Sequence, residues 1–342
     1  MRWLPSVGMV RWCRTGPDLK ENLSGGVGFV RRCRFGIWDE TWDFLLEITA
    51  LLSYEPRQRQ SAIATWEDAT MDSEDSIEVP GAILYYKVRG SGPVVLIIQG
   101  GAADADGSDA LASHLESDFT VVSYDRRGLS RSVLKPGAPP IDVGRHSEDA
   151  SMVLAVVTSE PAFVFGVSIG ALIGLELVTT HPNEIRMLIA HEPPLKQLLP
   201  PDEFEKALHE QEEVEVAFRN EGVRAAMMKF LQLSGVDFGD READAPAPQL
   251  SPYMADNLQF FLTNDAPAVR QYQIDLSLLG EVRSKVTPSA GETSTANWPN
   301  CCAARLAGQL HVELVHFPGG HNAYGSRPRG VADKLRVLLR TD

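Results

Sequence analysis

An apolar run that leads directly into Gly-Val-Ser-Ile-Gly is the feature that most constrains this chain. Residues 163–167 have the composition of a buried strand, and the segment after Ser168 is rich in helix formers and small residues. A serine on a sharp strand-to-helix turn holds its hydroxyl above the edge of a sheet, with the following amide free to bind an oxyanion. The alternative is a tight turn with an idle serine, since Gly-x-Ser-x-Gly alone is a weak pattern.

Strand and helix patterns alternate from residue 76 onward. Two apolar segments flank Pro80-Gly81 and predict an antiparallel hairpin. Further continuous apolar runs indicate buried strands with helices on both faces, and their alternation with helical segments predicts a mostly parallel sheet. The hairpin segments are 77–79 and 82–88, and the buried runs are 94–98, 119–124, 163–167 and 187–191.

Four motifs in this order and spacing resemble the α/β-hydrolase superfamily over residues 76–340. They are Gly100-Gly101, Tyr-Asp-Arg-Arg-Gly-Leu-Ser-Arg-Ser at 124–132, Gly-Val-Ser-Ile-Gly at 166–170 and Phe-Pro-Gly-Gly-His at 317–321. The resemblance implies an eight-stranded, mainly parallel sheet with helices on both faces. It also implies a helical cap between the sixth and seventh strands, which residues 195–283 would supply. Substrates vary widely among such folds, so the resemblance indicates a reaction class rather than a substrate.

A serine hydroxyl needs a base within hydrogen-bond reach to act as a nucleophile at neutral pH. Residues 312–317 are expected to form the last strand, and the loop that follows would bring His321 to the ligand-binding edge of the sheet. His321 is therefore the predicted base for Ser168. His191 stays open as an alternative because it neighbours the same site.

Two glutamates are candidates for the carboxylate that would orient this base, because the position where the resemblance implies an aspartate holds Ser294. Glu192 directly follows the predicted strand 187–191 and is fixed by two prolines, which suits an orienting carboxylate. Glu292, after the seventh predicted strand, is the rival. Both choices keep the chain order of serine, acid and histidine.

Two backbone amides are expected to form an oxyanion hole. One belongs to Ile169, the residue after the serine, and the other to Gly101 or Ala102 in the loop after strand 94–98. Glycine in that loop permits a close approach of backbone to ligand.

The charge balance favours a neutral or cationic small molecule as the binding partner and argues against nucleic acid. The 342 residues contain 46 acidic and 32 basic side chains, for a formal net charge of −14. No nucleotide fingerprint, metal-ligand spacing or membrane-spanning run occurs, so no cofactor and no membrane span are expected. The oligomeric state is left open. The four cysteines have no metal or disulfide pattern, which favours the cytoplasm; they are Cys13, Cys33, Cys301 and Cys302.

Composition changes near residue 72 and predicts two parts. Residues 1–71 are interpreted as a poorly ordered extension or a misassigned start of the reading frame, and a transit segment remains an alternative. Residues 72–342 are interpreted as the hydrolase domain.

The predicted function is a serine hydrolase that cleaves an ester, thioester, lactone or carbon–carbon bond of a small, largely apolar molecule through an acyl-enzyme. A non-hydrolytic enzyme of the same fold, acting by proton transfer, decarboxylation or cyclisation, is the first alternative. A catalytically inactive ligand-binding module is the second.

Overall fold

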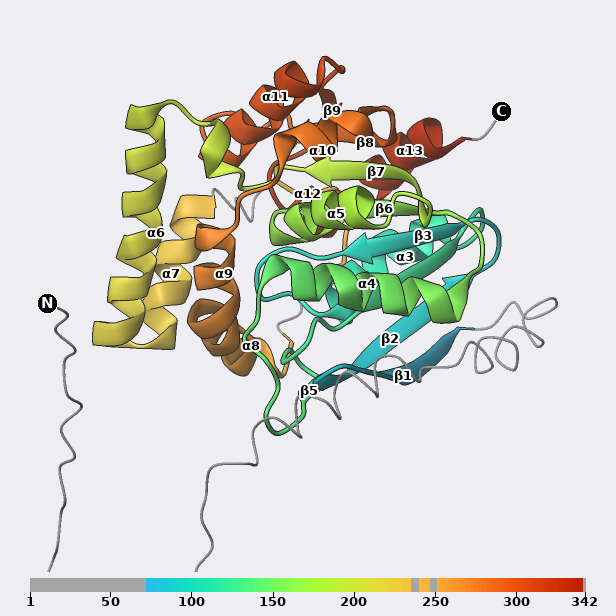
Figure 1. Cartoon of the computed structure of the whole chain (residues 1–342), viewed down its shortest axis with the longest axis horizontal. Coiled ribbons are helices and arrows are strands. Elements are labelled where there is room, and N and C mark those ends of the chain that lie inside the picture. Colours follow the sequence, from blue (N-terminus) through green and yellow to red (C-terminus); the bar gives the residue numbers. More distant parts are fainter. Residues whose placement is uncertain (1–71, 235–239, 247–250, 341–342) are drawn as a thin grey trace, which may run out of the picture. The chain divides into compact units, whose positions relative to one another are not determined.

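A computed structural model describes residues 72–234, 240–246 and 251–340, which form a sheet flanked by helices (Figure 1). The expected extension at 1–71 lies outside the described residues. The sheet runs in the order β1-β2-β4-β3-β6-β7-β8-β9, and β5 pairs with β2. The strands are β1 (Ser73–Val79), β2 (Ala82–Gly90), β3 (Val94–Ile98), β4 (Thr120–Tyr124), β5 (Val133–Leu134), β6 (Ala162–Val167), β7 (Ile185–His191), β8 (Val286–Gly291) and β9 (Val315–Phe317).

The sheet is mostly parallel, as the sequence predicts. Strands β3, β4, β6, β7, β8 and β9 are parallel to their neighbours in this group. Strands β1 and β2 form the expected antiparallel hairpin, and β2 also lies antiparallel to β4. The predicted number of strands was eight, and the ninth is the two-residue β5, which pairs with Ala82 and Ile83.

Helices cover both faces of the sheet, because successive side chains of its central strands point to opposite sides. In β3, Leu96 and Ile98 face the core under α4, α5 and α11, whereas Val95 and Ile97 face the core under α3, α12 and α13. All four side chains are fully buried. The covering helices are α3 (Asp109–Leu115), α4 (Val143–Val157), α5 (Ile169–Thr180), α11 (Trp298–Leu310), α12 (Ala323–Ser326) and α13 (Pro328–Leu339).

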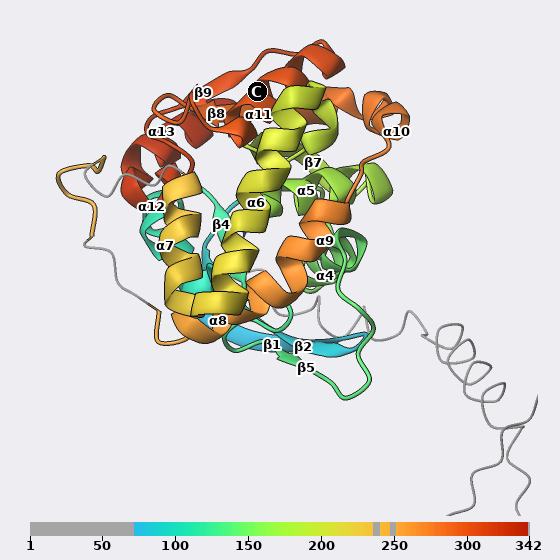
Figure 2. The ribbon, with the colours of Figure 1, turned by 90° about the vertical axis from the view of Figure 1, so that its left-hand side faces the viewer.

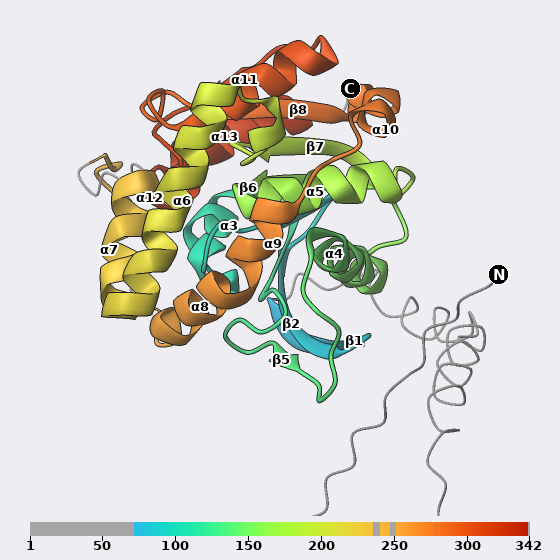
Figure 3. The ribbon, with the colours of Figure 1, turned by 60° about the vertical axis from the view of Figure 1, so that its left-hand side comes forward.

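A helical insertion lies between β7 and β8, where the sequence predicts a cap. Figures 2 and 3 show its first helices beside the sheet end toward which the arrows of the parallel strands point. We call residues 196–285 the insertion. Its helices are η4 (Lys196–Leu198), α6 (Pro201–Glu221), α7 (Val223–Ser234), α8 (Met254–Phe260), the π-helix η5 (Phe261–Asp265), α9 (Ala266–Gln271), α10 (Leu276–Glu281) and η6 (Arg283–Lys285).

The insertion is fastened to the loops that follow β3 and β4. Gly128 has φ +79°, and a Cβ atom there would lie 2.1 Å from the ring of Phe260, so only glycine leaves room for this contact. Asn257 donates to Ala102 O at 3.2 Å and to Ser130 Oγ at 2.8 Å. These contacts hold α8 against the edge of the sheet that carries the predicted site.

Candidate active site

Ser168 occupies a strained turn between β6 and α5. Its backbone angles are φ 56° and ψ −120°, and its amide donates to His191 O at 2.9 Å. A Cβ atom on Gly170 would lie 2.0 Å from Ile98 O, and one on Gly166 would lie 2.4 Å from Gly170 O. Both flanking glycines of the motif are therefore required, because a larger side chain at either position would collide with backbone atoms. The turn places Ser168 at the end of β6.

His321 is paired with Glu192, the acid that directly follows β7. His321 Nδ1 lies 2.6 Å from Glu192 Oε2, and the Glu192 side chain is fully buried. The imidazole is only 12% exposed. An ionised carboxylate accepts hydrogen bonds and cannot donate them, so this contact places a proton on Nδ1. The other ring nitrogen is then free to act as a base.

The second oxygen of Glu192 is held by neutral donors from the loop after β8 and from α11. Oε1 accepts from the amide of Gly291 at 2.9 Å, from Asn300 Nδ2 at 3.1 Å and from Ser294 Oγ. Burial by itself raises the pKa of Glu192, but the hydrogen bond and the charge of His321 outweigh it and lower the pKa to about 2. The carboxylate is therefore ionised at neutral pH.

The rival acid, Glu292, is not brought to His321. Its side chain is exposed, whereas its amide donates to Phe317 O at 3.0 Å. Ser294, at the position where the resemblance implies an aspartate, instead donates to Glu192. The loop after β8 thus contributes support for an acid that comes from β7.

The expected oxyanion loop lies against Ser168. A Cβ atom on Gly100 would be 3.2 Å from Ser168 Cβ, and Gly101 has φ +50°, a backbone conformation that favours glycine. Arg126 donates to Gly101 O and the insertion donates to Ala102 O, so the carbonyls of both residues are engaged. Ile169 is the first residue of α5, where amides have no acceptor within the helix. The three amides remain the candidates for the oxyanion hole.

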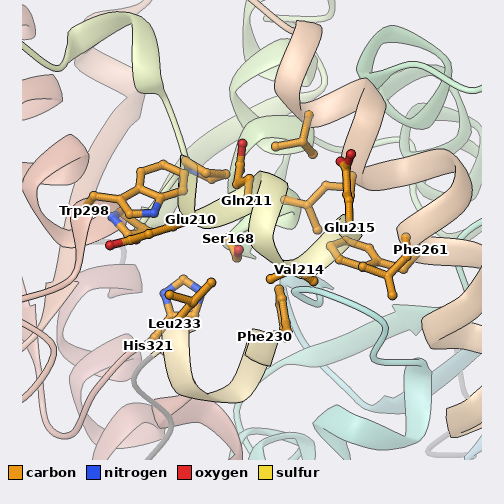
Figure 4. A pocket seen from close by; sticks show the side chains of 16 residues that line it. Ser168, Glu210, Gln211, Val214, Glu215, Phe230, Leu233, Phe261, Trp298 and His321 are labelled. Atoms are coloured by element: carbon orange, nitrogen blue, oxygen red, sulfur yellow. The ribbon is translucent and has the colours of Figure 1, made fainter. Parts of the chain in front are cut away.

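Ser168 and His321 line one cavity, whose remaining wall comes mostly from the insertion (Figure 4). Its empty space is about 800 Å³, including the part open to solvent. In Figure 4, Trp298 and His321 lie on one side of Ser168, and Phe261 and Glu215 on the other. Most of the wall is apolar, with the side chains of Val214, Phe230, Leu233, Phe261, Leu262 and Val269.

His191, the alternative base, is buried beneath the site. Its Nε2 lies 3.4 Å from Gly320 O, and its ring is close to those of Phe165 and Phe317. Burial lowers the pKa of His191 to about 4, against a smaller opposite effect of the Glu192 charge. A neutral, buried imidazole of this kind supports the loop that carries His321 rather than facing the cavity.

Two supporting features were missed by the sequence interpretation. Asn300 bonds both Glu192 Oε1 and Gly291 O, yet nothing in the sequence near it distinguishes it from an ordinary helix residue. The second is the partner of Arg126: this arginine of the motif at 124–132 is fully buried and bonds Asp265 of the insertion at 3.1 Å. Both depend on contacts between segments far apart in the chain.

Comparison with known proteins places the chain in a family. A model of the alpha/beta hydrolase fold matches residues 93–224. An uncharacterized hydrolase of Bacillus subtilis (strain 168), YraK, is 36% identical over 271 residues, which cover 78% of this chain and 96% of the relative. The chain belongs to the α/β-hydrolase family.

A second relative of this α/β hydrolase and a solved structure are more distant from it. A zearalenone hydrolase of Bionectria ochroleuca is 31% identical over 133 residues, which cover 37% of this chain and 50% of that protein. An α/β hydrolase from Sphaerobacter thermophilus has a similar structure, with a TM-score of 0.58 and 24% identity, covering 78% of this chain and 100% of the other. The latter similarity concerns the fold alone.

Within residues 72–234, 240–246 and 251–340, no group of three or more His, Cys, Asp or Glu side chains could hold a metal ion. No helix of those same ranges is long and apolar enough to cross a membrane. Cys301 and Cys302 are both free thiols.

Proposed function

We propose that the protein is a serine hydrolase in which Ser168 is the nucleophile, His321 the general base and Glu192 the carboxylate that orients the base. The observation that carries the proposal is the Glu192–His321 hydrogen bond at the wall of the cavity that Ser168 also lines. The ionised Glu192 holds the proton on Nδ1 and leaves the Nε2 lone pair for the serine proton.

In the proposed reaction, Ser168 Oγ attacks the substrate carbonyl as its proton passes to His321 Nε2. The amides of Ile169 and of Gly101 or Ala102 stabilise the oxyanion. The tetrahedral intermediate then breaks its bond to the leaving group, which takes the proton from Nε2. Water, deprotonated by the same nitrogen, attacks the acyl-enzyme, releases the acid product and returns the proton to Ser168.

The substrate that we propose is a small, largely apolar acyl compound, such as an ester, a thioester, a lactone or a compound with a cleavable carbon–carbon bond. Small-molecule sites are typically concave and mostly apolar, with a few polar groups at fixed positions. Its wall is dominated by aliphatic and aromatic side chains. No cofactor enters this mechanism.

The test is mass-spectrometric mapping of a fluorophosphonate probe on the purified protein. We expect a single adduct on Ser168 that disappears in His321→Ala and after heat denaturation. Hydrolysis of a plain p-nitrophenyl ester should depend on the same two residues. Turnover that persists in Ser168→Ala, or labelling of folded protein at another serine alone, would contradict the proposal and favour non-hydrolytic chemistry.

A further inference from the structure

Gln211 is a polar side chain in the otherwise largely apolar wall that the insertion contributes to the cavity. It lies on α6, and its Oε1 accepts a hydrogen bond of 2.6 Å from Lys196 Nζ. Among the described residues, no acceptor is bonded to its Nε2. The amide therefore has one end engaged within the protein and one end at the wall of the cavity.

Lys196 is an unusual partner, because it is a lysine with only 6% of its surface exposed. It lies four residues after Glu192, and its Nζ is 5.9 Å from the ring centroid of Trp298, another wall residue. Burial, with a smaller effect from the charge of Arg270, lowers the pKa of Lys196 to about 8. At neutral pH the side chain is still mostly an ammonium group, which can only donate hydrogen bonds.

The ammonium group fixes which way the amide of Gln211 is turned. An amide has an accepting oxygen and a donating nitrogen, and only the oxygen can accept from Lys196. The two N–H donors of Nε2 are therefore not used by Lys196 and are left for a ligand. A ligand that brings an acceptor to Nε2 gains a hydrogen bond that a hydrocarbon cannot make.

The surroundings of Gln211 decide what kind of acceptor suits the site. Glu210 and Glu215 also line the cavity from the same helix. Arg270 pairs with Glu215, whereas Glu210 pairs with the exposed Lys206 at 3.9 Å. A carboxylate or phosphate bound here would lose its hydration in a largely apolar cavity, which costs much more free energy than burying a neutral oxygen.

We propose that Gln211, oriented by Lys196, binds a neutral acceptor oxygen of the substrate that lies outside the group being cleaved. The oxygen belongs to a ketone, an ether or a hydroxyl group on an otherwise apolar chain. This inference rests on the proposed function, because it assigns substrate specificity within the same cavity. Gln211 is the specificity residue, and Lys196 is a positioning residue that acts through it.

The test compares p-nitrophenyl esters of equal length in which an ether oxygen replaces one methylene group at successive positions of the acyl chain, with a second series that varies the alcohol. We expect at least one position at which the ether ester has a kcat/KM about tenfold above that of the all-methylene ester. That ratio should fall to about one in Gln211→Leu, because leucine has no donor. It should also fall severalfold in Lys196→Met, in which the amide is free to turn.

Two further variants keep the test decisive if Lys196→Met does not fold. Gln211→Glu retains the shape and can pair with Lys196, but it replaces the donor with acceptors; the preference for the ether should vanish, whereas a hydroxyl-bearing ester should still be preferred. Gln259→Leu makes the matched change on the exposed face of α8 and should leave the wild-type ratio unchanged.

The outcomes separate this inference from the proposed function. If the plain ester is hydrolysed in a Ser168-dependent manner but no oxygen position is preferred, only the role of Gln211 is overturned. The same holds if the preference survives in Gln211→Leu. If no ester is hydrolysed and Ser168 does not label, the proposed function itself fails.

Discussion

Within residues 72–234, 240–246 and 251–340, two histidines pair with a buried carboxylate, and the two pairs differ in what else each partner touches. His321 Nδ1 lies 2.6 Å from Glu192, and His146 Nε2 lies 3.1 Å from Asp265. Both carboxylates are fully buried. The first pair lies at the end of the sheet beside Ser168, and the second joins α4 to the insertion.

The partners of the second pair give it a structural role. Asp265 also bonds Arg126, a permanent cation, which in turn donates to Gln99 O at 2.8 Å and to Gly101 O. His146 is fully buried, and its Nδ1 has no hydrogen-bond partner among the described residues. By contrast, the ring of His321 borders a cavity. A histidine–carboxylate pair is thus suited to catalysis only where the free ring nitrogen can reach a substrate.

The largest expected difference between the pairs is in turnover. His321→Ala should lower kcat on an ester by about 10⁴-fold or more, because it removes the base. His146→Leu should change kcat far less and should lower the melting temperature. Steady-state kinetics and thermal unfolding of both variants check this, and equal losses of kcat at unchanged stability would remove the distinction.

Substitution of the orienting carboxylate should have the next largest effect on kcat. Glu192→Gln should lower kcat by about 10³- to 10⁴-fold, because a neutral amide no longer stabilises the imidazolium or holds its proton on Nδ1. Glu292→Gln is the matched control and should stay within about twofold of wild type, since Glu292 is exposed. A loss in the control that equals the loss in Glu192→Gln would restore Glu292 as the acid.

The contrast between these pairs also shows what the sequence could predict. The alternation of strands, the insertion and the serine turn follow from local patterns, and the fold derived from them is confirmed. The preference for Glu192 came from its place after a buried strand, and its contact with His321 fits that prediction. No local pattern marks Ser294 or Asn300 as donors to this carboxylate, because α11 and the loop after β8 meet it only in the folded chain.

The pairing of Asp265 with His146 and Arg126 could not be predicted from the sequence for the same reason. Asp265 and Arg126 are 139 residues apart in sequence, and neither has a neighbour that identifies the other. A buried ion pair of this kind becomes visible only when the insertion is placed on the loops of the sheet.

Breaking the pair formed by Asp265 should lower the stability of the protein more than it lowers kcat. Asp265→Asn leaves Arg126 buried without a countercharge, and we expect unfolding free energy to fall by about 3 to 5 kcal/mol. Urea denaturation at pH 7 measures this. Asp256→Asn, at an exposed position of α8, is the control and should change stability by no more than about 0.5 kcal/mol. A variant as stable as wild type would show that Asp265 does not fasten the insertion.

A third histidine, His191, should give the smallest effect, which is a change in stability with pH. His191 has a pKa of about 4 in the folded protein, below its ordinary value of 6.5, so the unfolded chain binds more protons between these values. Stability contributed by burying the neutral ring is therefore complete above about pH 6.5 and is lost as pH falls toward 4.

Glu192 affects stability at lower pH than His191 does. Its pKa is about 2 when folded, so its contribution is present above its ordinary value of 4.5 and is lost only as pH falls from there toward 2. Urea denaturation at pH 7 and pH 4.5 therefore isolates His191 from Glu192. Between these two pH values, wild type should lose about 2 kcal/mol more than His191→Leu. Equal losses in the two proteins would mean that His191 is not held neutral beneath the site, and the support it gives to the His321 loop would need another source.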